Sequence, residues 1–245
     1  MQLVVSKYND PAINLALEEF LFNKTDEEFI LFYINNPSVI IGCNQILQNE
    51  VNEDFCKSHD IPIYRRISGG GAVYHDLGNL SYSFIRNKAD NKANLSADFL
   101  NPIVFALKSF GIQPVVGKRK DLWLPDENKI SGTAAHLTAK RVLHHGTLLY
   151  DTDLDKLVGA LSSSMKNTEL KGIASVPSPV KNIKTFLEEN SLKYYTTIEF
   201  FQIIINQVKT FHQVAKEYSF DDNAMIDIEL LALEKYRSES WNKRK

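Results

Sequence analysis

The sequence predicts an α/β (α+β) fold in a single domain that spans residues 1–245. Helical and strand patterns alternate along the chain, and no long polar linker, repeat or low-complexity segment separates them. A chain of 245 residues is long enough to bury most of its apolar surface. Its 44% hydrophobic and 24% charged residues are typical of globular proteins.

The first half of the chain opens with a predicted helix. Asp10 is a suitable N-cap and Pro11 suits the first helical position. The apolar face of this helix would consist of Ile13, Ala16, Leu17, Phe20 and Leu21. A turn is predicted at residues 35–37 and a short helix at Asn49–Ser58. Strands are predicted at Phe29–Ile34, Ser38–Ile41, Ile61–Arg66 and Asn79–Ile85.

The second half begins with a predicted helix at Pro102–Phe110, which should end at Gly111, a frequent residue just past a helix. Polar turns at residues 125–128 and 138–141 separate three predicted strands, Asp121–Leu124, Lys129–Leu137 and Val142–Tyr150. Helical periodicity predicts two further helices, Asp153–Leu161 and Ile198–Tyr218.

The bulk charge and the cysteine content exclude several classes of protein. A net charge of -2 gives no support for a nucleic-acid partner, and the basic tail Lys243–Lys245 is predicted to be a solvated end. Two cysteines cannot form a disulfide framework, which indicates a reducing, cytoplasmic compartment. The N-terminus lacks a signal-peptide pattern, and no stretch approaches the roughly 18 apolar residues of a membrane span.

The segment Arg65–Asn79 carries the strongest chemical pattern. Three consecutive glycines, Gly69–Gly71, suit a main chain that turns sharply or approaches a ligand closely. Bare N–H groups in such a run can bind an anion, and adjacent arginines suit phosphate or carboxylate. The alternative is a flexible turn between strands. The spacing matches neither a phosphate-binding P-loop nor a dinucleotide-binding motif.

A second pattern combines Asp121 with Lys129, which lies at the start of a predicted strand that contains Gly132. The lysine could stabilise a phosphate or a developing oxyanion. The aspartate could help to hold Mg²⁺, which usually takes one or two carboxylates together with phosphate oxygens. By composition alone, a surface hairpin is the favoured explanation for each of these two residues.

The third pattern is the run His144–Tyr150, with His75 and His136 elsewhere in the chain. The spacing of these histidines matches no common zinc site, and no cysteine accompanies them, so hydrogen-bonding histidines on a sheet are favoured over metal ligands. The chain also lacks the GxSxG motif of serine hydrolases.

Six segments together resemble the lipoate–protein ligase A family, and they occur in the family's order. The segment most specific to the family is Arg65–Asn79, which is similar to its RRxSGGGAVxHDxGN loop. The others are Pro11–Glu19, Ile41–Gln45, Lys129–Gly132, His145–Leu149 and Val180–Ile183.

The resemblance implies a mixed sheet flanked by helices, a fold shared with biotin–protein ligases. It also implies a two-step reaction in which lipoate and MgATP give lipoyl-AMP, and a lysine of a carrier protein then takes the lipoyl group. The implied acceptors are apo lipoyl domains of 2-oxoacid dehydrogenase E2 subunits and the glycine-cleavage H protein. Lys129 is the implied catalytic residue, with a weaker assignment of Asp121 to Mg²⁺. The implied substrate- and nucleotide-binding residues are Arg66, Ser68, Gly69, Gly70, Gly71, Ala72, Val73, Tyr74, His75, Asn79, Lys129, Gly132, His145, Gly146 and Thr147.

Three departures from the family leave alternatives open. Cys43 stands where the family often has a basic residue, and Arg119-Lys120-Asp121 replaces an Arg-Asn-Asp run. The ending Lys235–Asn242 resembles the junction at which many members continue into a C-terminal accessory domain, which this chain is expected to lack. The alternatives are a ligase subunit that needs a separate accessory protein and an ATP-independent lipoyl or octanoyl transferase. A thioester route through Cys43, a non-catalytic binder and biotin ligation are less favoured.

Overall fold

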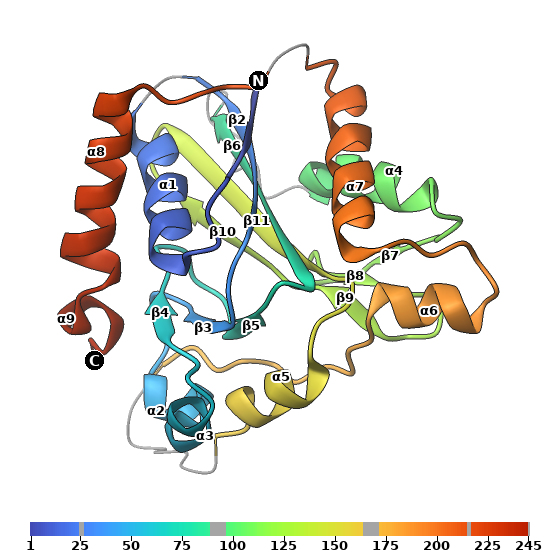
Figure 1. The fold of residues 1–245 in the computed structure, drawn as a ribbon, viewed down its shortest axis with the longest axis horizontal. Helices are drawn as coiled ribbons and strands as arrows, with labels where there is room; N and C mark the ends of the chain where they lie inside the picture. The colour runs from blue at the N-terminus through green and yellow to red at the C-terminus, as the bar shows by residue number, and fades with distance from the viewer. Residues whose placement is uncertain (25–26, 89–96, 164–171, 215–216, 245) are drawn as a thin grey trace.

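The computed structural model describes residues 1–24, 27–88, 97–163, 172–214 and 217–244. A five-stranded sheet with the strand order β1-β2-β6-β11-β10 forms the centre of the molecule (Figure 1). The strands β1 and β2 are parallel and the other neighbours are antiparallel, so the sheet is mixed, as predicted. The five strands are β1 (Gln2–Val5), β2 (Phe29–Ile34), β6 (Asn79–Asn87), β10 (Thr133–Leu137) and β11 (Arg141–Leu149).

Helices cover both faces of this sheet. On one face α1 (Pro11–Lys24) lies between the sheet and α8 (Asp222–Leu231), and on the other face α4 (Asn101–Lys108) packs against α7 (Thr197–Phe211) (Figure 1). Successive side chains of β2 point to opposite faces of the sheet, so this strand contributes to the core on each side. Ile30 and Phe32 enter the core beneath α4 and α7, whereas Leu31 and Tyr33 enter the core beneath α1.

Two smaller sheets flank the central one. The first has the order β4-β3-β5, with β3 (Ser38–Ile41), β4 (Ile63–Arg65) and β5 (Val73–His75), and it packs against α2 (Leu47–Glu50), α3 (Glu53–Ser58) and α5 (Leu154–Leu161). The second has the order β7-β8-β9, with β7 (Val115–Val116), β8 (Leu122–Trp123) and β9 (Lys129–Ser131). The remaining elements are the 3₁₀ helix η1 (Ala97–Leu100), α6 (Ile183–Glu189), the π-helical turn η2 (Ala232–Tyr236) and α9 (Glu239–Asn242).

Several predicted elements are confirmed. The Asp10 carboxylate caps α1 by accepting a hydrogen bond from the backbone N–H of Ala12 at 2.8 Å. The strands Phe29–Ile34 and Ser38–Ile41 have the predicted bounds. They belong to different sheets, however, because the turn between them redirects the chain.

Other predicted elements have the wrong bounds. The predicted strand Lys129–Leu137 breaks at Gly132 into β9 and β10, which lie in different sheets. The predicted helix Ile198–Tyr218 ends at Phe211, and Gln213 has a left-handed φ of 53° that a helix cannot accommodate. The predicted helix Asn49–Ser58 is two short helices, because Asn52 caps a new one by accepting a hydrogen bond from the N–H of Phe55.

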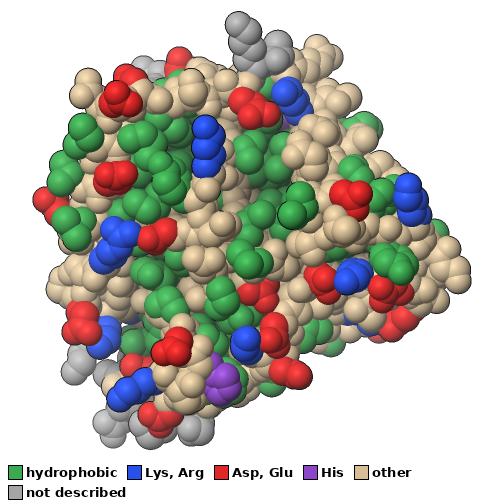
Figure 2. Space-filling model, in the orientation of Figure 1, with side chains coloured by type: hydrophobic (Ala, Val, Ile, Leu, Met, Phe, Trp, Pro, Cys, Tyr) green, Lys and Arg blue, Asp and Glu red, His purple; other side chains and the backbone are tan. Residues whose placement is uncertain are grey.

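The surface carries no dominant charge on the face shown in Figure 2, where acidic and basic side chains are interspersed. This mixing matches the formal net charge of -2. Within the described ranges, no helix is both long and apolar enough to cross a bilayer.

The C-terminal segment is anchored to the fold as well as solvated. The Arg244 guanidinium lies 3.9 Å from the centre of the Trp241 ring and donates a hydrogen bond to the carbonyl of Cys43 at 3.0 Å. Lys243 and Arg244 are both exposed, as predicted, and Lys245 lies outside the described residues.

Arg65 explains this anchoring. Its side chain is fully buried and donates hydrogen bonds to backbone carbonyls of two distant segments. The carbonyls of Gly42 and Gln45 accept at 3.0 and 2.8 Å, and those of Asn242 and Arg244 accept at 3.1 and 3.0 Å. Arg65 therefore joins the C-terminal end to the Gly42–Gln45 turn and does not contribute charge to a ligand site.

We expect Arg65→Met to lower the free energy of unfolding by about 3 kcal/mol or more, because several buried carbonyls lose their donor. Urea denaturation measures this loss. Arg237→Met is the matched control, because Arg237 forms an exposed ion pair with Asp10 whose loss should cost about 1 kcal/mol or less. Equal losses in the two variants would contradict the role of Arg65.

Candidate active site

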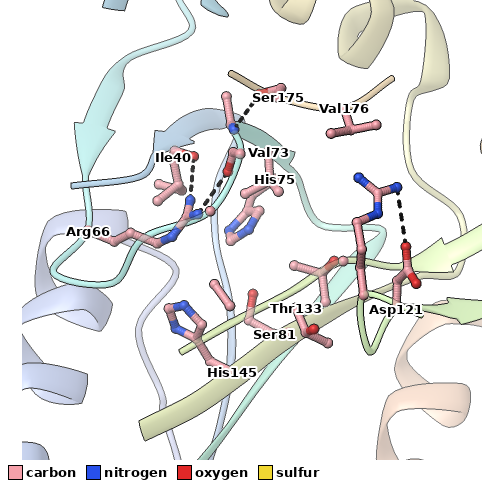
Figure 3. A pocket seen from close by; sticks show the side chains of 18 of the residues that line it. Ile40, Arg66, Val73, His75, Ser81, Asp121, Thr133, His145, Ser175 and Val176 are labelled. Carbon is pink, nitrogen blue, oxygen red and sulfur yellow. Dashed lines mark hydrogen bonds and ion pairs between the residues drawn. The ribbon is translucent and has the colours of Figure 1, made fainter. Parts of the chain in front are cut away.

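A cavity of about 290 Å³ lies between the central sheet, the glycine-rich loop and the segment Ile173–Val176. Figure 3 shows Arg66, His75 and His145 converging on this cavity from different elements. The lining residues are Leu15, Tyr33, Ile40, Arg66, Gly70–Val73, His75, Ser81, Arg119, Asp121, Lys129, Gly132–Ala134, His145–Thr147 and Ile173–Val176.

The floor of the cavity is one row of residues across the sheet. Tyr33 on β2 pairs with Ser81 on β6, and Ser81 pairs with Thr147 on β11. The N–H of Thr147 donates to the carbonyl of Gly132 at 3.2 Å, and Gly132 follows β9, where Lys129 lies. Because strands are spaced by about 4.8 Å, the row spans roughly 14 Å from Tyr33 to Gly132. The small side chains in its middle leave the space that forms the cavity.

The glycine-rich loop closes one side of the cavity by close backbone contact. Gly70 has a φ of 86°, which glycine adopts without strain. A Cβ on Gly42 would overlap the carbonyl oxygen of Gly70, so only glycine permits this approach. The two motifs that contain these glycines are therefore parts of one wall.

Arg66 holds the loop in place from beneath. Its Nη2 donates to the carbonyls of Gly69 and Gly71 at 2.6 and 2.8 Å, and its Nη1 donates to the carbonyl of Ile40 at 3.0 Å. Its Nε donates to the Ser68 hydroxyl at 2.9 Å. Burial lowers the pKa of Arg66 to about 10, with Glu18 opposing the effect, so the side chain stays charged near neutral pH. These bonds leave one of its five N–H groups for a ligand.

A buried chain of hydrogen bonds supports this arrangement. The Glu18 carboxylate accepts from the Ser83 hydroxyl at 2.5 Å and lies 2.9 Å from His145 Nδ1. His145 Nε2 lies 2.7 Å from the hydroxyl of Ser68. Burial alone would raise the pKa of Glu18, but the charge and hydrogen bond of His145 and the Ser83 bond lower it overall. Because the ionised carboxylate accepts only, His145 carries a proton on Nδ1.

Lys129 lies at the opposite end of the floor from Tyr33. Its Nζ is 3.3 Å from Oδ2 of Asp121, and Arg119 Nη2 is 3.5 Å from the same oxygen. Burial lowers the pKa of Lys129 and Asp121 only partly offsets the effect. The backbone around Lys129 is fixed, because its N–H donates to the carbonyl of Pro179 at 2.8 Å and it forms a parallel bridge with Val180. This end of the cavity is positively charged.

The segment Ile173–Val176 covers the glycine-rich loop. The Ser175 hydroxyl accepts from the N–H of Ala72 at 2.9 Å and from Gln45 Nε2 at 3.1 Å. The N–H of Ser175 donates to the Glu50 carboxylate at 2.9 Å. Gln45, within the predicted motif Ile41–Gln45, thus ties the cover to the Gly42 turn.

Comparison with known proteins identifies the family. A model of the lipoyl protein ligase A/B catalytic domain matches residues 10–209. The chain belongs to this family. It is 40% identical over 235 residues to lipoate–protein ligase 1 of Staphylococcus aureus, and 38% identical over 238 residues to lipoate–protein ligase LplJ of Bacillus subtilis. The matches cover 95% and 96% of this chain and 70% of each relative. The predicted family and enzyme class, a ligase, are confirmed.

Solved ligase structures confirm the predicted fold. One is a bi-partite lipoate protein ligase studied with its E2 lipoyl domain from Thermoplasma acidophilum, with a TM-score of 0.82 at 26% identity over 99% of this chain and 95% of that chain. A putative lipoate protein ligase of the same organism with bound lipoic acid gives the same TM-score and identity, over 99% and 98% of the two chains. A lipoate–protein ligase A bound with ATP has a TM-score of 0.80 at 26% identity, over 99% and 98%.

Most residues predicted for the ligase site meet at the cavity. Those that line it are Arg66, Gly70, Gly71, Ala72, Val73, His75, Asp121, Lys129, Gly132, His145, Gly146 and Thr147. Four predicted residues do not line it: Ser68, Gly69, Tyr74 and Asn79. Ser68 acts beneath the loop between Arg66 and His145, and Tyr74 packs into the separate core beside α5.

Sequence reasoning did not assign several residues to the ligase site. Leu15, Tyr33 and Ile40 form much of its apolar part, Ser81 lies in the middle of its floor, and the segment Ile173–Val176 covers it. Glu18, which fixes His145, lies within the opening motif Pro11–Glu19, so that motif was the available signal. Tyr33 and Ser81 sit in ordinary strand patterns, and only the register of β2 on β6 brings them together.

The histidines have separate structural explanations. His144 stacks on Phe99 with ring centroids 4.1 Å apart, on the opposite face of β11 from His145. In the parts of the chain that are described, no group of three or more His, Cys, Asp or Glu side chains is arranged to hold a metal ion. Neither Cys43 nor Cys56 lines the ligase cavity.

His75 predicts a pH-dependent loss of stability in this ligase. Burial, then the charges of Arg66 and His145, lower its pKa from 6.5 to about 3. As the pH falls, the unfolded chain therefore takes up this proton before the folded protein does. The free energy of unfolding is undiminished by His75 above pH 6.5 and decreases as the pH falls toward 3. Between pH 7 and pH 5 the wild type should lose about 2 kcal/mol more unfolding free energy than His75→Gln. Urea titrations at both pH values test this, and equal losses in the two proteins would contradict it.

Proposed function

We propose that this chain activates lipoate with ATP and transfers the lipoyl group to a specific lysine of carrier-protein lipoyl domains. One observation carries the proposal: a single cavity joins an apolar end, lined by Leu15, Tyr33 and Ile40, to an end that holds Lys129, Arg119 and Asp121. An apolar acid fits this slot with its carboxylate toward the charged end, where the phosphates of ATP would also be neutralised.

The chemistry needs positioning and charge neutralisation more than a protein nucleophile. In the first step a carboxylate oxygen of lipoate attacks the α-phosphorus of ATP, and the bond to the pyrophosphate oxygen breaks. In the second step the ε-amine of the acceptor lysine attacks the acyl carbonyl, AMP leaves with the bonding electrons, and the amine releases a proton to solvent. Lys129 would stabilise the charge that develops in both steps.

Mg²⁺ would accompany ATP in this proposal. Asp121 is the one acidic side chain among the described residues that line the cavity. A single carboxylate suits Mg²⁺, which commonly takes its other ligands from phosphates and water. Asp121 is held in place by Lys129 and Arg119, and the hydrogen bond from Trp123 and the charge of Lys129 lower its pKa despite burial, so it stays ionised.

The acceptors in this proposal are apo lipoyl domains of E2 subunits and the glycine-cleavage H protein, met in the cytoplasm. Residues 1–245 constitute one catalytic domain. A second candidate rests on the similarity to one chain of a bi-partite lipoate protein ligase, with a TM-score of 0.82 at 26% identity. In that case a separate accessory polypeptide would be required for activation, and this chain alone would transfer lipoyl from lipoyl-AMP.

We expect Lys129→Ala to lower lipoyl transfer by at least about 100-fold while leaving the fold intact, because the charge at the reacting carbonyl is lost. The acceptor's mass reports transfer, and circular dichroism with thermal melting reports folding. Lys184→Ala is the matched control, because Lys184 pairs with Asp151 outside the cavity. A folded Lys129→Ala variant with near-normal turnover would rule out this role for Lys129.

The two half-reactions that the purified protein carries out distinguish a self-sufficient ligase from a chain that only transfers the lipoyl group. The purified protein is incubated with lipoate, MgATP and an apo lipoyl domain, and acceptor mass and pyrophosphate are followed together. Acceptor modification with pyrophosphate release is expected of a self-sufficient ligase. If only supplied lipoyl-AMP is transferred, activation requires another polypeptide. Transfer of an octanoyl or lipoyl group from a carrier protein without ATP would establish the transferase instead.

A further inference from the structure

The mouth of the ligase cavity lies between the β7–β8 hairpin and the segment Ile173–Val176. Among the described residues that line the cavity, the exposed ones are Arg119, Ile173, Ala174 and Val176. Figure 3 shows Val176 and Asp121 at the same end of the cavity. The guanidinium of Arg119 donates a hydrogen bond to the Ser178 hydroxyl at 3.2 Å, which joins the two sides of the mouth. A macromolecule that reaches into the cavity therefore covers these two segments.

This mouth opens beside Lys129, where the proposed acyl transfer takes place. Asp121 Oδ2 lies 3.3 Å from Lys129 Nζ and 3.5 Å from Arg119 Nη2, so the exposed Arg119 and the half-buried Lys129 share one carboxylate. In the proposed function, the acceptor lysine brings its amine to the acyl carbonyl at this end of the cavity. The carrier domain that presents the lysine therefore rests on the rim of the mouth.

The tip of the β7–β8 hairpin adds two further cations to this rim. The turn is tight, because the N–H of Gly117 donates to the carbonyl of Asp121 at 2.8 Å and the N–H of Lys120 donates to the carbonyl of Gly117 at 2.9 Å. The Lys120 carbonyl in turn accepts from the Thr133 hydroxyl at 2.8 Å. Lys118 is exposed and Lys120 is half-buried, and neither lines the cavity. Neither ammonium group pairs with a carboxylate of the described residues, so both can meet carboxylates of another molecule.

The opposite side of the mouth is aliphatic. Ile173 is 50% exposed and Val176 is 60% exposed. Large apolar side chains that remain exposed beside charged ones are typical of a surface that binds another protein. A partner that fits this mouth makes a small apolar contact on one side and presents carboxylates on the other.

We propose that Lys118 and Lys120 dock an acidic carrier domain, whose carboxylates flank the lysine that receives the lipoyl group. This inference rests on the proposed function and assigns an acceptor-binding surface to it. An acceptor lysine has the same charge as the hairpin tip, so its approach is repelled unless carboxylates accompany it. The phosphates of ATP are the other anions of the reaction. They belong inside the cavity, which Arg119 and Lys129 line and the two docking lysines do not.

The test measures transfer from supplied lipoyl-AMP to an apo lipoyl domain of an E2 subunit, which bypasses the activation step. The variant Lys118→Glu/Lys120→Glu is compared with the wild type. We expect its KM for the acceptor to rise at least about tenfold at low salt and its kcat to change less than about twofold. The dissociation constant of lipoyl-AMP, from isothermal titration, should stay within about twofold of the wild-type value. Lys57→Glu/Lys140→Glu is the matched control, because it makes the same charge change at exposed lysines outside the cavity.

A charge swap tests the contact itself. In the apo lipoyl domain, the two carboxylates nearest the acceptor lysine are changed to lysine. We expect this altered domain to be a poor acceptor for the wild type and a better one, by about fivefold or more in kcat/KM, for Lys118→Glu/Lys120→Glu. A merely structural role for the hairpin tip would lower transfer to both acceptors alike and would not reverse the preference.

The outcomes separate this inference from the proposed function. A wild type that transfers the lipoyl group, with an acceptor KM unchanged in Lys118→Glu/Lys120→Glu, overturns the inference alone. Weaker binding of lipoyl-AMP with an unchanged acceptor KM also overturns it, because the two lysines would then serve the phosphate. A wild type that transfers no lipoyl group from lipoyl-AMP to any apo lipoyl domain overturns the proposed function, and the docking inference with it.

Discussion

The buried guanidinium of Arg66 holds together the wall of the active site. It binds carbonyls of the glycine-rich loop and of β3 and the hydroxyl of Ser68, and Ser68 contacts His145, which is paired with Glu18. The chain of contacts thus connects α1, the loop and β11. A glycine-rich loop is entropically costly to order. Because the glycines have no side chains that could hold the loop, a fixed guanidinium with several donors holds it through its backbone carbonyls.

The cavity combines two environments that require different neighbours. Its apolar end depends on the packing of α1 against the sheet, which excludes water around Leu15 and Tyr33. Its charged end depends on the small sheet β7-β8-β9, where Asp121 keeps Lys129 and Arg119 close despite their like charge. The row Tyr33–Ser81–Thr147 joins the two ends, and its serine and threonine leave room that larger side chains would fill.

The C-terminal segment is bound to the same framework through the other arginine of the pair. Arg65 ties the carbonyls of the last helix to the Gly42–Gln45 turn, and that turn contacts both the glycine-rich loop and Ser175. Adjacent arginines thus have opposite tasks, because side chains at the end of β4 alternate between its two sides. From the residues alone both arginines were anion-binding candidates beside the glycines, and only the family resemblance singled out Arg66.

The sequence by itself determined most of the individual helices and strands and the cap of α1, and its motifs determined the family. The mixed sheet flanked by helices and the meeting of the motifs at one site were implied by the resemblance to that family. The elements and the cap follow from local chemistry, namely turn residues and the spacing of apolar residues, and the family follows from uncommon runs such as Gly69–Gly71. Only the tertiary structure decided that Gly132 splits one predicted strand between two sheets and that Tyr33 and Ser81 line the cavity. Those features depend on strand register and on contacts between distant segments, which no local pattern encodes.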